Sequence, residues 1–293
     1  MAVHAPAREE RATTADTAAV GAADALEERA RRALDGVLDP ELDEPITDLG
    51  FVRSVAADGD RRLTVHLRLP TSFCSPNFAY LMASDAKDAL TSLPGAGAVT
   101  VLLDDHHDSD LINRGLAADA GYRGTFGAEA DDSLDGLRLV FRRKAHAAAM
   151  ERALTALLRQ DPARTPEHLH GITLGDLPPT AATRALLRRR DALGLGTAPS
   201  DPAMVDDAGR PYAADEIPLR LRFARSVRLS IDGNAHFCRG LLRTRYPDSA
   251  PDQTPRREDT TRPQDPRSQD PRSQDTTRPE GVTRLSRTEE HTP

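Results

Sequence analysis

The sequence has no tryptophan and few other aromatic residues, which limits the core that it can build. Phe, Tyr and Trp together make up 4% of the 293 residues, and all hydrophobic residues 38%. Both values are low for a chain that is folded throughout. The length is enough for one large domain or two small ones. We therefore expect a folded part with a real core and other parts that stay outside it.

Long apolar runs are also missing. No stretch approaches the length that a membrane-spanning helix needs, and the first residues lack the basic-then-apolar plan of a secretory signal. Cysteine occurs twice, as Cys74 and Cys238, which is too few for a disulfide framework. The sequence therefore predicts a cytoplasmic protein that does not act at a membrane.

A positive charge excess is absent as well. The formal net charge is −7, whereas sequence-independent binding to nucleic acid depends on a concentrated basic patch. We expect no nucleic-acid partner.

The two ends of the chain are poor in apolar residues. Residues 1–22 are rich in Ala, Thr and Glu, and residues 247–293 consist mainly of Pro, Asp, Arg, Gln, Ser and Thr, with a repeated Gln-Asp-Pro-Arg-Ser. Such segments cannot bury enough apolar surface to offset the entropy lost on ordering. Both are predicted to be disordered.

Between these ends, the first part of the chain follows the pattern of an α+β domain. Apolar residues recur at helical spacing or alternate as in a strand, and Pro and Gly separate the segments. The order helix, strand, strand, helix, strand is predicted for residues 23–38, 49–55, 63–69, 77–93 and 99–103.

The remainder, residues 105–246, is predicted to be mostly helical. Helical spacing is clearest over 134–158 and is also present over 111–118 and 183–193. Two later segments, 219–231 and 236–242, are apolar enough to pack. Residues alone assign no function to this region.

Four motifs occur in order within residues 23–104. They are Leu38–Leu42 (Leu-Asp-Pro-Glu-Leu), Ile46–Val52 (Ile-Thr-Asp-Leu-Gly-Phe-Val), Thr71–Cys74 (Thr-Ser-Phe-Cys) and Leu93–Gly95 (Leu-Pro-Gly). In order and spacing they resemble the SufT/PaaD-like family of iron–sulfur (metal–sulfur) cluster assembly factors, here with an extra helical region. Two departures are a cysteine one place early in its loop and the missing tryptophan after the third strand.

The resemblance implies an iron–sulfur cluster assembly or transfer factor that helps client metalloproteins to mature, and not an enzyme. It implies a transient iron–sulfur cluster or iron as cargo. The partners would be the iron–sulfur assembly machinery or a client apo-metalloprotein, and a homodimer is left open. Because a cluster usually takes four thiolates or substitutes, two cysteines cannot hold one alone.

Cys74 is the first candidate for a functional thiol. It is predicted at the junction of a strand and a helix, where backbone N–H groups and the helix dipole favour the thiolate. Thiolate binds iron and attacks persulfide. The alternative is a small buried apolar side chain, which is common for free cysteine.

Other candidates for cofactor binding are Asp39, Glu41, Asp48 and Thr71. Carboxylates can ligate iron or hydrogen-bond to a ligand, and a threonine hydroxyl can donate to a thiolate or a cluster sulfur. Equally, Asp39 can be a helix-end residue, Asp48 a turn residue and Thr71 an ordinary loop cap.

His106 and His107 lie in an acidic run, and imidazole with carboxylate suits iron or zinc. Neighbouring residues of a strand point to opposite sides, which favours a solvated loop instead. His236 and Cys238 form a second possible ligand pair, because a strand would place both on one face.

Two further functions stay open. One is a dedicated maturation chaperone or adaptor for a metal-containing oxygenase, in which residues 105–246 recognise the client and no cluster binds. The other is a metal-dependent enzyme using His106 and His107. No nucleophile elbow, phosphate-binding loop or dinucleotide fingerprint supports an enzyme.

Overall fold

The computed structural model describes residues 7–127, 134–161 and 163–247. Apart from Pro247, the predicted disordered tail therefore lies outside the described residues. The described residues belong to one compact unit. None of the described helices has the length and hydropathy that crossing a membrane requires.

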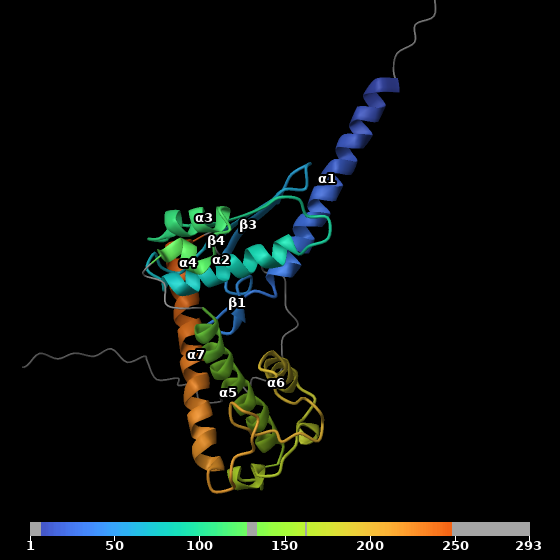
Figure 1. The fold of residues 1–293 in the computed structure, drawn as a ribbon. Coiled ribbons are helices and arrows are strands. Elements are labelled where there is room, and N and C mark those ends of the chain that lie inside the picture. The colour runs from blue at the N-terminus through green and yellow to red at the C-terminus, as the bar shows by residue number, and fades with distance from the viewer. Residues whose placement is uncertain (1–6, 128–133, 162, 248–293) are drawn as a thin grey trace, which may run out of the picture. The chain divides into compact units, whose positions relative to one another are not determined.

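Helices and strands follow each other in the mixed order expected for an α+β unit with a helical region after it (Figure 1). The elements are α1 (Ala7–Leu34), β1 (Leu38–Asp39), β2 (Glu44–Pro45), β3 (Val52–Ala57), β4 (Leu63–Arg68), α2 (Pro76–Thr91), β5 (Val99–Asp104), α3 (Ser109–Ala117), α4 (Gly121–Phe126), α5 (Leu134–Gln160), η2 (Pro166–Leu169), η3 (Leu174–Asp176), α6 (Ala181–Ala192) and α7 (Ile217–Arg245). The predicted fold class is confirmed.

Helix α1 is longer than the sequence predicts. It begins at Ala7, so the expectation of disorder up to residue 22 is wrong from residue 7 onward; residues 1–6 lie outside the described part. This segment is rich in alanine, which has the highest intrinsic helix propensity. Leu26, Ala30 and Leu34 are buried at i, i+4 and i+8, and α1 contacts β3 and α2.

The three-stranded sheet has the order β3-β4-β5. β3 and β4 pair antiparallel and β4 and β5 parallel. A parallel pair needs a crossover connection, and α2 supplies it. The first strand begins later than predicted, at Val52, because residues 46–50 form turns and Gly50 has a φ of +77°.

The helical region contains one helix where two apolar segments are predicted. α7 runs without a break through Gly233 and includes both 219–231 and 236–242. It lies alongside α5, which also contacts α6 (Figure 1).

Helix α7 takes part in two hydrophobic cores. Ile217 and Ala224 belong to the core that α5 and α6 also build, whereas Ala235 and Leu242 belong to the core of the α+β unit. The C-terminal half of α7 therefore covers part of the α+β unit, and Cys238 of α7 packs against the same core as Cys74.

Candidate functional site

The loop between β4 and α2 holds Cys74. Ser75 is the N-cap of α2 and Pro76 its first residue. The thiol is half-buried, and its Sγ lies 3.4 Å from the Oγ1 of Thr71. The same hydroxyl oxygen accepts a hydrogen bond from the backbone N–H of Phe73 (3.2 Å). Thr71 therefore fixes the loop and touches the candidate thiol.

His106 fastens this loop from the other side. The backbone N–H of Asp108 donates to its Nδ1 (3.0 Å), so the ring carries its proton on Nε2 and donates it to the carbonyl oxygen of Cys74 (2.8 Å). The side chain is buried. Both ring nitrogens are thus engaged. In this conformation His106 positions the cysteine loop, and its role as a metal ligand stays a prediction.

His107 points elsewhere. Its backbone N–H donates to the carbonyl of Ser72 (2.9 Å), and its exposed ring lies 5.9 Å from that of Phe73. The two histidines do not converge on a common point. The acidic run leads from β5 into α3 through a turn, and His107 as a metal ligand stays a prediction.

Asp39 lies in β1 and is buried. Its Oδ1 accepts hydrogen bonds from the backbone N–H groups of Glu41 (2.9 Å) and Leu42 (2.8 Å). Burial nevertheless raises the pKa of Asp39 to about 6 from its ordinary value of 3.8, and the negative charge of Glu41 adds to this. A carboxyl group that titrates near neutral pH is common at functional sites.

Helix α7 brings the second cysteine to this place. Cys74 and Cys238 both pack against the core of the α+β unit. Burial raises the pKa of the Cys238 thiol to about 11, and Asp39, Cys74 and Glu41 contribute to the rise. Four titratable groups are therefore gathered: Asp39, Glu41, Cys74 and Cys238.

The remaining candidates, Asp48 and His236, are not part of this group. Asp48 lies in the turn between β2 and β3, and among the described residues it is not one of the groups that raise the pKa of Cys238. His236 is exposed on α7, whereas Cys238 is half-buried. Residues i and i+2 of a helix point to nearly opposite sides, so the predicted His236 and Cys238 ligand pair does not form.

The spacing of apolar residues along α7 places Cys238 on the buried side of the helix. Ile231, Ala235, Cys238 and Leu242 recur at i, i+4, i+7 and i+11, the spacing of a buried helical stripe. Contacts beside this stripe fasten α7 to the β1–β2 hairpin. Nδ2 of Asn234 donates to Glu41 (3.2 Å), and Arg239 forms an ion pair with Glu44.

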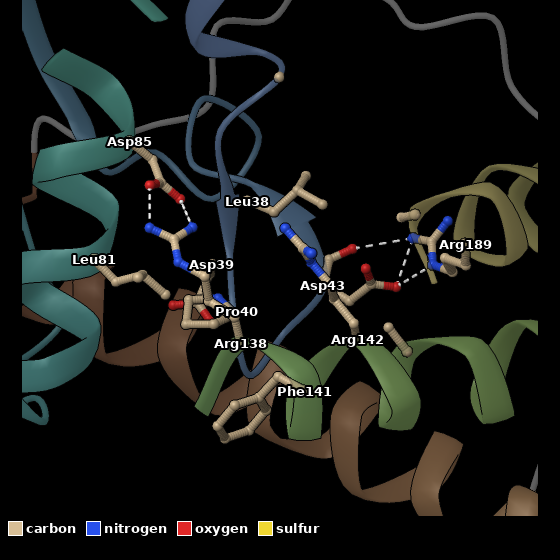
Figure 2. Close-up of a pocket in the computed structure, with 13 residues that line it drawn as sticks. Leu38, Asp39, Pro40, Asp43, Leu81, Asp85, Arg138, Phe141, Arg142 and Arg189 are labelled. Carbon is tan, nitrogen blue, oxygen red and sulfur yellow. Dashed lines mark hydrogen bonds and ion pairs between the residues drawn. The ribbon is translucent and has the colours of Figure 1, made fainter. Parts of the chain in front are cut away.

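A cavity of about 260 Å³ adjoins Asp39 on the side of α2, α5 and α6 (Figure 2). Arg138 makes two hydrogen bonds with Asp85 (2.8 and 2.6 Å), and Nε of Arg189 donates to Asp43 (2.6 Å). In Figure 2, Arg142 extends from α5 toward the hairpin. Arg189 therefore ties the hairpin to α6, whereas the Arg138–Asp85 pair joins α5 to α2.

Among the described residues, no three His, Cys, Asp or Glu side chains are arranged to hold a metal ion. This agrees with the count of two cysteines.

Cys238 should react slowly with iodoacetamide. Alkylation requires the thiolate, and raising the pKa from 9.0 to about 11 lowers the thiolate fraction at pH 8 about 100-fold. We expect Cys238 in the Cys74→Ser variant to be alkylated about 100-fold more slowly than in the same variant unfolded in urea, as followed by mass spectrometry. Equal rates would show that the thiol is not shielded by the fold.

Comparison with known proteins relates the α+β unit to one family. Residues 27–103 match the model of a family described as iron-sulfur cluster assembly protein. A similar solved structure is that of a domain of unknown function (DUF59) from Bacillus anthracis, 25% identical, covering 36% of this chain and 99% of that one, with a TM-score of 0.28. No curated protein matches.

The family match confirms the resemblance at the level of iron–sulfur assembly proteins. It spans the elements from α1 to β5 and includes Asp39 and Cys74. Helix α7, with Cys238, lies outside it. The narrower resemblance to SufT and PaaD proteins stays a prediction.

Proposed function

We propose that this protein is a SufT/PaaD-like iron–sulfur assembly or transfer factor that holds its cargo transiently at Cys74 and passes it to client metalloproteins. The observation that carries the proposal is the gathering of Cys74, Cys238, Asp39 and Glu41 where α7 covers the α+β unit. A cytoplasmic location and the absence of enzymatic turnover are part of the proposal.

Each residue has a defined task in this proposal. Cys74 is the primary ligand, Thr71 stabilises its thiolate by a hydrogen bond, and His106 holds the loop in place. At most one of Cys238 and Asp39 coordinates together with Cys74, because no three such side chains among the described residues are arranged to hold a metal ion. Because both are protonated over part or all of the neutral range, binding of an iron species releases protons and strengthens as the pH rises.

The small number of ligands favours transfer over storage. Two thiols and the nearby carboxylates leave coordination positions for a donor or a client to occupy. A client that supplies more thiolates would then withdraw the cargo.

Anaerobic reconstitution followed by iron and sulfide analysis, with a visible spectrum, tests the proposal. The wild type should bind iron and sulfide, and Cys74→Ser should lose both. Cys238→Ser is the matched variant and should bind less of each. A cluster retained by Cys74→Ser at the wild-type level would overturn the proposed ligand.

The burial of both thiols and the protonation of Cys238 favour a second function. Both cysteines are half-buried, and Cys238 stays protonated at neutral pH, which suits a maturation chaperone for a metal-containing oxygenase that binds no cluster. The same experiment separates the two, because the chaperone predicts no iron in the wild type and client maturation that survives Cys74→Ser.

A further inference from the structure

Helix α7 exposes a row of large apolar side chains. Leu219, Phe223, Leu229, Phe237 and Leu241 are each between 46% and 69% exposed. Leu219, Phe223, Phe237 and Leu241 lie within about 40° of one another around the helix, whereas single exposed apolar residues are usually scattered over a surface. Leu229 lies on the flank of this row. Apolar side chains gathered along one side of a helix indicate a contact surface.

Leu219, Phe223 and Phe237 of this row follow the spacing of a helix–helix interface. Steps of four and three residues alternate along the side of α7 opposite the buried stripe, as at the a and d positions of a coiled coil. We call this set the seam; it consists of Leu219, Phe223, Ser226, Ser230, Gly233, Phe237 and Gly240. No seam residue is charged, and Arg222 and Arg225 lie along its edge.

The seam is complementary to itself. Phe223 lies seven residues before Ser230 and Phe237 seven after it, and Leu219 and Leu241 lie eleven residues to either side. When two copies of α7 pack antiparallel about Ser230, Phe223 of each copy therefore lies near Phe237 of the other, and Leu219 near Leu241. The small residues between Ser226 and Gly233 allow the helices to approach closely at the centre. Leu229 then lies near its own copy, as a two-fold axis requires.

The area is sufficient for a stable pair. With about 200 Å² for a fully exposed large side chain, the five apolar residues expose about 500 Å² per chain. A pair would bury about 1,000 Å² from these side chains alone, and flanking residues add to it. A specific interface needs about 1,000 Å² in total.

We propose that the seam of α7 is a homodimer interface in which two copies of this chain pack antiparallel about an axis near Ser230. Cys238 lies eight residues from the axis, so the two copies of it are separated by about 24 Å along the helices. The dimer thus carries two separate cysteine sites. It does not depend on the proposed cargo.

The mass of the full-length protein in solution tests the proposal. Light scattering after gel filtration should give twice the chain mass of 31.8 kDa for the wild type. The double variant Phe223→Asp/Phe237→Asp should dissociate at least about 100-fold more readily. Phe73→Asp, at a phenylalanine that is 79% exposed outside α7, is the matched control and should stay dimeric. Circular dichroism verifies that each variant is folded.

Disulfide trapping tests the arrangement independently. Under mild oxidation, Ser230→Cys should form a dimer through its own copy, whereas Thr244→Cys, exposed near the end of α7, should not. A wild type that is monomeric at every concentration overturns the proposal, whether another protein or another segment of this chain covers the seam. A dimer that survives the double variant overturns it as well.

Discussion

Replacing Asp39 by asparagine should stabilise the protein at pH 8 by about 2–3 kcal/mol and change little at pH 4. Folding raises the pKa of this carboxyl group from 3.8 to about 6 because its ionised form is buried. The folded wild type therefore binds the proton more tightly than the unfolded chain does. Its stability falls as the pH rises through the window from about 4 to 6, and asparagine removes that loss.

The amide keeps the local structure. Both backbone N–H groups that contact Asp39 donate to Oδ1, and the carbonyl oxygen of asparagine accepts them equally well. Urea denaturation at the two pH values measures the effect, with Asp24→Asn, at an exposed position of α1, as the control. Stabilisation that is equal at pH 4 and pH 8 would contradict the burial of an ionised group.

The same variant also bears on function. A buried carboxylate that destabilises the fold at neutral pH is expected where activity needs the charge. If Asp39 takes part in holding cargo, the more stable Asp39→Asn protein should bind less iron. Stabilisation with unchanged iron binding would assign Asp39 to the hairpin alone.

Replacing Arg190 by alanine should destabilise the helical region by about 3–5 kcal/mol. Arg190 is buried, with Nε donating to the carbonyl of Gly196 (2.6 Å) and Nη1 to that of Pro202 (2.8 Å). Alanine leaves both carbonyls without these donors and opens a cavity beneath α6. Denaturation followed by circular dichroism measures the loss.

The neighbouring arginines serve as controls. Arg188 is exposed, and Arg188→Ala should change the stability by less than about 0.5 kcal/mol. Arg189 forms an ion pair with Asp43. The stability lost in Arg189→Ala should therefore lie between the losses in Arg188→Ala and Arg190→Ala. If the three alanine variants unfold alike, Arg190 does not hold the loop after α6 as its contacts indicate.

These three consecutive arginines mark a limit of sequence reasoning. All lie in a segment that helical spacing predicts correctly, 183–193 against the observed Ala181–Ala192. Spacing cannot tell which of them is buried, because that depends on the loop from Gly196 to Pro202 folding back over α6. The loop has no periodicity of its own.

In the candidate site, too, the sequence indicates some of the residues, whereas only the fold brings in the others. Motifs in the first part of the chain single out Asp39 and Cys74, because Pro40 follows the first of them directly and Thr71, Ser72, Ser75 and Pro76 surround the second, interrupting the apolar pattern. The hydrogen bonds of His106 were not predictable, since they depend on the loop carbonyl of Cys74 approaching the end of β5. Cys238 joins the site only because α7 packs back over the α+β unit.

The sequence by itself determined the α+β class, the helical region after it and the resemblance to iron–sulfur assembly proteins. Those features depend on local periodicity, turn residues and motifs within 23–104, each of which acts over a few residues. Only the tertiary structure decided which polar groups are buried, which thiols are neighbours and which face of α7 stays exposed. Burial and proximity depend on contacts between residues distant in the chain. The spacing of side chains within one segment does not predict these contacts.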